Sequence, residues 1–135
     1  TRGVGDLAAG RAWIASCYAG EDAVGTLRAL RAHPADGAQR AADLMETRSP
    51  LGVCVALEAI RRAGRMESVD QVLEQDLRLG ASFAGSADFL EGVRALLVDR
   101  DNSPRWLHDS LLEVPAAEVT QMFAGGRLEV EASNR

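Results

Sequence analysis

Apolar residues recur at intervals of three and four along most of the chain, which is the spacing of helices that bury one face. A period of two, typical of half-buried strands, is not convincing anywhere in the sequence. The pattern therefore predicts an all-α segment of about seven helices joined by short loops. The expected helices are 6–18, 21–32, 36–47, 50–63, 69–84, 87–98 and 115–123.

Capping residues mark where several of these helices begin. Asp36 can accept hydrogen bonds from the free amides at the start of the third helix. Ser49 precedes Pro50, a proline at the first helical position, where its missing N–H costs nothing. Ser68 and Gln71 have the spacing of a capping box at the start of the longest helix.

The helix expected at 69–84 carries an apolar seam that a single carboxylate, Asp76, interrupts. A lone buried carboxylate is costly, so Asp76 should have a donor, and Arg94 on the following helix is the predicted partner. We favour this structural ion pair over a catalytic role for Asp76. The seam comprises Val69, Val72, Leu73, Asp76, Leu77, Gly80, Ala81 and Ala84.

Composition narrows the classes of protein that fit this pattern. Hydrophobic residues make up 47% and aromatic residues only 4%, which suits closely packed helices with Ala, Leu and Val inside. A net charge of -5, with basic residues interspersed among acids, argues against nucleic-acid binding. No apolar run is long enough to span a bilayer, so we expect no membrane contact and a cytoplasmic protein. The two cysteines follow no metal or redox spacing, and we expect reduced thiols.

The stretch 88–106 adds an ordered set of polar and aromatic residues to the helical pattern. Phe89, Val93, Leu96 and Leu97 form an apolar stripe, after which a charged loop leads to a proline and a tryptophan. By itself this arrangement predicts a helix, a loop and an aromatic anchor. The residues that make up the motif are Asp88, Phe89, Glu91, Gly92, Arg94, Asp99, Asp101, Pro104 and Trp106.

The same stretch, DFLEGVRALLVDRDNSPRW, resembles the C-terminal element of the enoyl-CoA hydratase/isomerase (crotonase) superfamily, in its 3-hydroxyisobutyryl-CoA hydrolase branch. The preceding Asp-Phe and the following Asp-Lys/Arg-Asp-x-x-Pro-x-Trp mark that branch. The resemblance implies that residues 1–124 are the helical region of a longer protein. The stretch 125–135 shows little core-forming pattern, which predicts a flexible tail. The resemblance also implies that the α/β core, with its oxyanion-hole glycines and catalytic carboxylates, lies outside this chain.

The resemblance further implies an activity for the parent protein, namely hydrolysis of 3-hydroxyisobutyryl-CoA in valine breakdown. For the segment itself we expect no catalysis, no cofactor and no metal, with acyl-CoA as the substrate class of the parent. One alternative is the C-terminal part of an enoyl-CoA hydratase or isomerase. Another, from a different class, is a non-enzymatic helical interaction module.

Two motif residues invite a role in CoA binding. Arg94 could clamp a phosphate, but it lies in mid-helix, so we favour an internal ion pair for Arg94 and a role for Glu91 in capping a neighbouring turn. Glu91 and Arg94 are three residues apart and can also meet across one helical turn. Trp106 could stack on adenine, although such a residue more often pins a loop to the helices beneath it.

An apolar face should remain where this segment meets the missing core or another subunit. We therefore expect the parent to be a homo-oligomer. The candidates for that face are Leu7, Trp13, Ile14 and Phe83.

Overall fold

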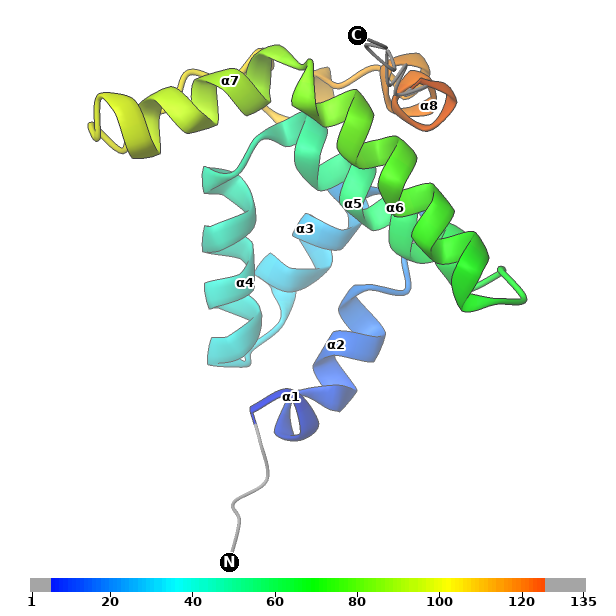
Figure 1. Cartoon of the computed structure of the whole chain (residues 1–135). Coiled ribbons are helices and arrows are strands. Elements are labelled where there is room, and N and C mark those ends of the chain that lie inside the picture. The colour runs from blue at the N-terminus through cyan, green and yellow to red at the C-terminus, as the bar shows by residue number, and fades with distance from the viewer. Residues whose placement is uncertain (1–5, 126–135) are drawn as a thin grey trace, which may run out of the picture.

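The structure, a computed structural model, describes residues 6–125, and the regular secondary structure in that range consists of helices joined by loops, without strands (Figure 1). The predicted fold class is therefore confirmed; the expected tail lies, from residue 126 on, outside the described residues. No helix in 6–125 is long and apolar enough to cross a membrane. The elements are α1 (Asp6–Ala9), α2 (Arg11–Cys17), α3 (Ala23–Ala32), α4 (Asp36–Thr47), α5 (Pro50–Ala63), α6 (Val69–Ala84), α7 (Ala87–Val93), a π-helical turn η1 (Arg94–Val98), a 3-10 turn η2 (Leu111–Glu113) and α8 (Ala116–Ala124).

The helices α4, α5 and α6 have the predicted bounds, and polar caps fix the starts of α5 and α6. The predicted cap of α4 is wrong, because Asp36 is the first residue inside the helix and Ala35, which has no capping side chain, precedes it. The Ser49 hydroxyl accepts a hydrogen bond from the Gly52 amide at 3.0 Å. The Ser68 hydroxyl accepts from the Gln71 amide at 3.3 Å. The Gln71 side chain accepts in turn from the amide of Glu67, one residue before the position that a capping box would use.

Two predicted helices are interrupted. The first divides at Gly10 into α1 and α2. The signature helix changes at Arg94 from α-helix to one π-helical turn, in which the Asp99 amide donates to the Arg94 carbonyl at 2.8 Å. Single π-helical turns inside helices often occur at functional sites, and this one lies inside the motif.

The helices enclose two separate hydrophobic cores. In the N-terminal core, α2, α3 and α4 bury Cys17, Leu30, Ala38 and Ala42. In the C-terminal core, α5 and α6 bury Leu51, Val55 and Leu79, and residues of α8 pack against them. In Figure 1 the first three helices lie below α5, while α6 and α8 lie above or in front of it. Both cysteines are free thiols, as expected, and burial raises the pKa of the Cys54 thiol.

The apolar seam of α6 is on the surface, which contradicts the predicted burial of that face. Val69, Leu73 and Leu77 are 72%, 59% and 64% exposed, whereas α6 buries Gln75 and Leu79. The helix packs on α5, α7 and α8 through the side that carries these two residues. The three exposed side chains are called the α6 outer face below.

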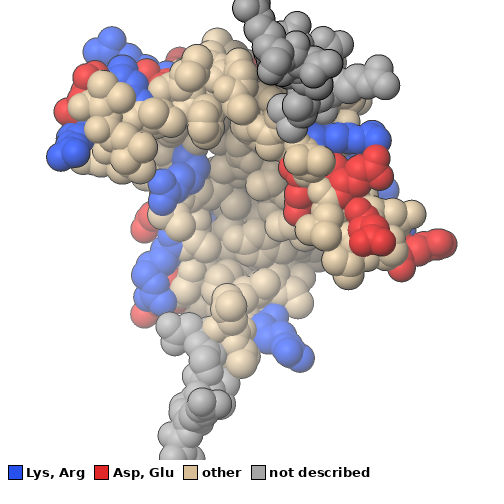
Figure 2. Space-filling model, viewed as in Figure 1, with Lys and Arg blue, Asp and Glu red and all other residues tan. Residues whose placement is uncertain are grey.

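A second apolar surface lies on the arm formed by α7 and η1, which extends from the body in Figure 1. Much of this arm is uncharged in Figure 2, and its charged side chains gather near the outer end. Among the four residues predicted to remain exposed, Leu7 is 81% exposed, as expected. Trp13 packs against the N-terminal core and Phe83 against the C-terminal core, and Ile14 is half-buried. The exposed apolar residues of the arm are Phe89, Leu90, Leu96, Leu97 and Val98.

Candidate functional site

Arg94, the first residue of η1, holds the signature segment together. Its Nε and Nη2 donate to the two carboxylate oxygens of Glu91 at 2.9 and 2.7 Å. Its Nη1 donates to Asp99 and Asp101, both at 2.7 Å, and Nη2 also reaches the Ser103 carbonyl at 3.4 Å. A guanidinium has five N–H groups, and these contacts account for all of them. The expected internal pairing of Arg94 is confirmed, Glu91 pairs with it instead of only capping a turn, and no donor is left for a phosphate.

The charges in this network stabilise one another. Hydrogen bonds from Arg94, followed by one from the Arg105 amide, lower the pKa of Glu91 to about 2. The same guanidinium, followed by the Ser103 amide, lowers the pKa of Asp101, and the three carboxylates raise that of Arg94. General acid–base catalysis needs a group whose pKa lies near the working pH. Glu91 and Asp101 are therefore suited to structure and not to proton transfer.

The loop after η1 takes an uncommon backbone path. Arg100 and Asn102 have φ angles of 55° and 52°, in the left-handed region that few residues other than glycine adopt. The Asn102 amide donates to the carbonyl of the buried Ala95 at 3.0 Å, and Asp101, between the two left-handed residues, is held by Arg94. These contacts fix the loop onto the end of the helix.

Asp88, in the first turn of α7, connects the motif to α5. Its side chain is only 5% exposed. One carboxylate oxygen accepts from the Leu107 amide at 2.8 Å, and the other accepts from the hydroxyl of Ser49, the residue that caps α5. This carboxylate therefore fastens the segment after the loop to a helix almost forty residues earlier in the chain.

Trp106 pins the end of the loop, as predicted. Its indole N–H donates to the carbonyl of Thr47, the last residue of α4, at 3.3 Å. Its ring lies over Gly92, where a Cβ would come within 3.5 Å of it. Pro104, just before it, is half-buried. Phe89 is 49% exposed and belongs to the outer surface of the arm instead.

The predicted ion pair between Asp76 and Arg94 is wrong. Asp76 is exposed on α6, and the ion-pair partners of Arg94 are Glu91, Asp99 and Asp101. The prediction failed because it assumed that the apolar seam around Asp76 was buried. Once that face is exposed, water solvates the carboxylate and no buried donor is needed.

The two histidines are the remaining side chains that could take part in acid–base catalysis or bind a metal. His33 accepts from the Ala35 amide through Nδ1 at 3.1 Å. His108 lies 2.8 Å from Glu118 of α8, and its side chain is only 15% exposed. Within residues 6–125 no three His, Cys, Asp or Glu side chains are arranged to hold a metal ion.

Comparison with known proteins gives this segment a family context. The family model described as enoyl-CoA hydratase/isomerase matches residues 2–123. The 3-hydroxyisobutyryl-CoA hydrolase of Dictyostelium discoideum is 36% identical over 75 residues, which cover 56% of this chain and 20% of that protein. Small ribosomal subunit protein mS47 of Arabidopsis thaliana is 44% identical over 61 residues, or 43% of this chain and 15% of that protein.

A solved structure, titled carnitinyl-CoA dehydratase from Mycobacterium thermoresistibile, aligns with a TM-score of 0.85 and 38% identity. The alignment covers the whole of this chain and 38% of that one. This chain thus spans about a fifth of the curated hydrolase and less than half of the solved dehydratase. Because the family model accounts for nearly the whole described range, the chain belongs to the enoyl-CoA hydratase/isomerase family.

Proposed function

We propose that this chain is the C-terminal helical region of an enzyme that hydrolyses 3-hydroxyisobutyryl-CoA to the free hydroxy acid and CoA. The observation that carries the proposal is the 36% identity with a hydrolase of that name. Thioester hydrolysis requires donors for the developing oxyanion and a group that activates water. Arg94, Glu91 and Asp101 of the signature segment hold one another and supply neither. The segment therefore has a structural role and is inactive alone.

The exposed apolar surfaces support a role in assembly. The α6 outer face and the arm of α7 and η1 expose large aliphatic side chains that a single folded chain would normally bury. In the proposal these surfaces lie against the α/β core of the same enzyme or against a second subunit of a homo-oligomer. Acyl-CoA is the substrate of the whole enzyme, and the helical segment needs no cofactor. A cytoplasmic location stays a prediction, since the name of the Dictyostelium relative places that protein in mitochondria.

Two other readings have specific support. The solved dehydratase is 38% identical over the whole chain, which favours an enzyme that adds or removes water at an acyl-CoA. This chain is also similar to a protein named small ribosomal subunit protein mS47, and that similarity favours a non-enzymatic interaction module.

A chimera experiment distinguishes these readings. Residues 6–125 would replace the matching C-terminal segment of the Dictyostelium hydrolase and, separately, of the mycobacterial dehydratase. We expect the hydrolase chimera to release CoA from 3-hydroxyisobutyryl-CoA, detected with a thiol reagent, and the isolated segment to release none. A matched chimera with Leu73→Glu and Leu77→Glu should lose activity, because charges would then lie in the interface.

The outcomes that refute the proposal are equally definite. Release of CoA by the isolated segment would show that it holds reactive groups of its own. A folded but inactive hydrolase chimera together with an active dehydratase chimera would favour the second reading. Two folded but inactive chimeras would favour the interaction module.

A further inference from the structure

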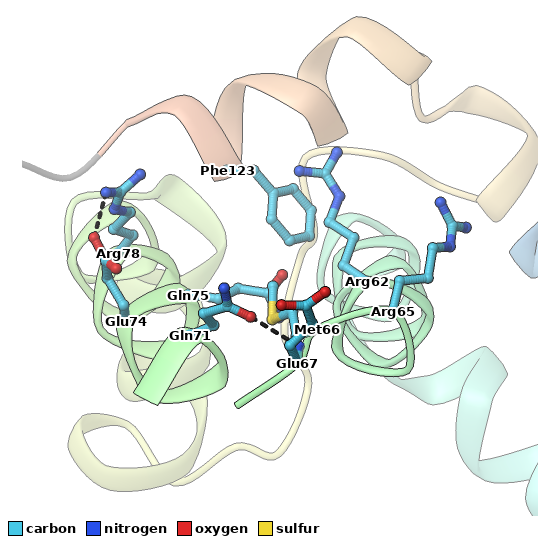
Figure 3. Close-up of a pocket in the computed structure, with 9 residues that line it drawn as sticks. All are labelled: Arg62, Arg65, Met66, Glu67, Gln71, Glu74, Gln75, Arg78 and Phe123. Carbon is cyan, nitrogen blue, oxygen red and sulfur yellow. Dashed lines mark hydrogen bonds and ion pairs between the residues drawn. The ribbon is translucent and has the colours of Figure 1, made fainter. Parts of the chain in front are cut away.

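A pocket of about 510 Å³ lies between α5, α6 and α8, lined by residues other than those of the signature motif (Figure 3). Gln75 and Arg78 come from α6, Arg62 from α5 and Phe123 from α8, while Arg65 and Met66 follow the end of α5. The continuous stretch 62–78, which runs from the end of α5 into α6, and the distant residue Phe123 thus contribute polar and apolar groups to one cavity. None of these residues is used by the proposed function.

Gln75 gives this pocket an unsatisfied acceptor. Its side chain is only 8% exposed, and its Nε2 donates to the Ala59 carbonyl at 3.1 Å. Its Oε1 is buried without a hydrogen-bond partner, the one such side-chain atom in the described residues. Buried acceptors without donors are rare and call for an explanation. Because this oxygen has almost no accessible surface, a ligand that brings an O–H or N–H group would supply the missing donor only after a neighbouring side chain moves aside.

Most of the arginines around the pocket are already paired with carboxylates. Arg62 pairs with Glu58 at 2.8 Å, and Arg78 pairs with Glu74 at 2.5 Å. Arg65, which is exposed at the rim, has no carboxylate partner within residues 6–125. Arg65 is thus the guanidinium open to an oxyanion. Glu67, which also lines the pocket and has no ion-pair partner in the described residues, is the carboxylate that such a ligand would have to avoid.

The aromatic ring in the pocket argues against a nucleotide. The guanidinium of Arg62 covers the Phe123 ring at 3.9 Å from its centroid, and Phe123 also packs on the C-terminal core. A base would have to displace the arginine before it could stack there. Met66, whose unbranched side chain adapts easily, lies beside Gln75 in Figure 3 and can move to admit a small aliphatic group.

We propose that this pocket binds a short hydroxycarboxylate. The carboxylate pairs with Arg65, the hydroxyl donates to Gln75 Oε1, and the carbon chain lies against Met66 and the edge of Phe123. The acid released in the proposed hydrolysis belongs to this class. Its identification as the natural ligand rests on the proposed function, whereas the chemistry of the pocket does not.

The test compares three probes by NMR titration of the purified chain: 3-hydroxyisobutyrate, isobutyrate and inorganic phosphate. Isobutyrate keeps the carboxylate and the carbon skeleton but lacks the hydroxyl. We expect the hydroxy acid to bind about tenfold more tightly than isobutyrate, as a hydrogen bond to a buried acceptor would require. The side-chain amide of Gln75 and the ring of Phe123 should shift on binding.

Variants separate the two polar contacts. Gln75→Leu should abolish the preference for the hydroxy acid while leaving the binding of isobutyrate, and the nearly isosteric Gln75→Met should do the same. Arg65→Gln should weaken both acids. The control Arg40→Gln removes the same charge from the exposed surface of α4 and should change neither.

Three results would overturn the proposal: equal affinity for the two acids, phosphate binding as tight as that of the hydroxy acid, or no shift at Gln75 or Phe123 at the highest ligand concentration. The titration involves no hydrolysis. A negative titration therefore does not contradict the proposed function, and an inactive chimera does not contradict ligand binding in the pocket.

Discussion

Asp88 offers the sharpest test of how the signature segment is held. The substitution Asp88→Ala removes the acceptor of two hydrogen bonds, one from the Leu107 amide and one from the Ser49 hydroxyl. Hydrogen bonds to a charged group contribute about 1.5–3 kcal/mol each. Part of this is offset because the variant no longer buries a carboxylate, and Leu107 is partly open to water. We therefore expect a loss of about 2 kcal/mol in the free energy of unfolding, or about 8 °C in Tm at this chain length.

Urea denaturation followed by circular dichroism measures this loss, and hydrogen exchange at the Leu107 amide reports whether that contact has opened. The matched control is Asp76→Ala, which removes an exposed carboxylate from α6 and should change the free energy of unfolding by less than about 0.5 kcal/mol. An Asp88 variant as stable as the wild type would refute the structural role of this carboxylate. So would a control that is destabilised to the same extent.

Three further substitutions probe other parts of the structure. Because the pKa of Glu91 is lowered to about 2, its contribution to stability is present above its ordinary pKa of 4.5 and is lost as the pH falls toward 2. Arg94→Gln should therefore make Tm fall less steeply between pH 4.5 and pH 2. If Tm falls with pH as steeply in the variant as in the wild type, the ion network does not contribute to stability. Leu30→Ala should cost about 3 kcal/mol in urea denaturation, since Leu30 is fully buried, and a loss below about 1 kcal/mol would mean that the N-terminal core is loosely packed. Leu73→Gln with Leu77→Gln should leave stability within about 0.5 kcal/mol and reduce self-association in gel filtration, whereas a loss above about 2 kcal/mol would show that the α6 outer face is buried within the chain.

Local signals in the sequence predicted most of the fold. The bounds of α5 and α6 follow from Ser49 and Ser68, because a cap acts on amides only three residues away and needs no knowledge of the tertiary structure. The pairing of Arg94 with Glu91 was predictable for the same reason, as the two lie one helical turn apart. Its other partners, Asp99 and Asp101, depend on a loop with two left-handed residues. Asparagine adopts that conformation more readily than most residues, but nothing in the sequence marks Arg100 for it.

Tertiary placement was harder to predict. Periodicity identifies an apolar stripe on α6, but it does not say whether the same chain covers that stripe. In the structure α6 packs through Gln75 and Leu79, and Leu73 remains outside. The unsatisfied oxygen of Gln75 could not be foreseen either, because glutamine at that position reads as an ordinary solvent-facing residue. One residue of the sequence did argue against burial of the seam: Asp76 lies in its middle, and aspartate is rarely buried.

The division into two cores has a consequence for how the chain unfolds. The cores share no buried residue, and α3 packs against α5 where the two halves meet. Cooperative units of this kind can open separately, each with its own free energy. Amide exchange at Leu30 should therefore follow a different denaturant dependence from exchange at Val55, and a partly unfolded species that keeps α5, α6 and α8 paired would precede global melting.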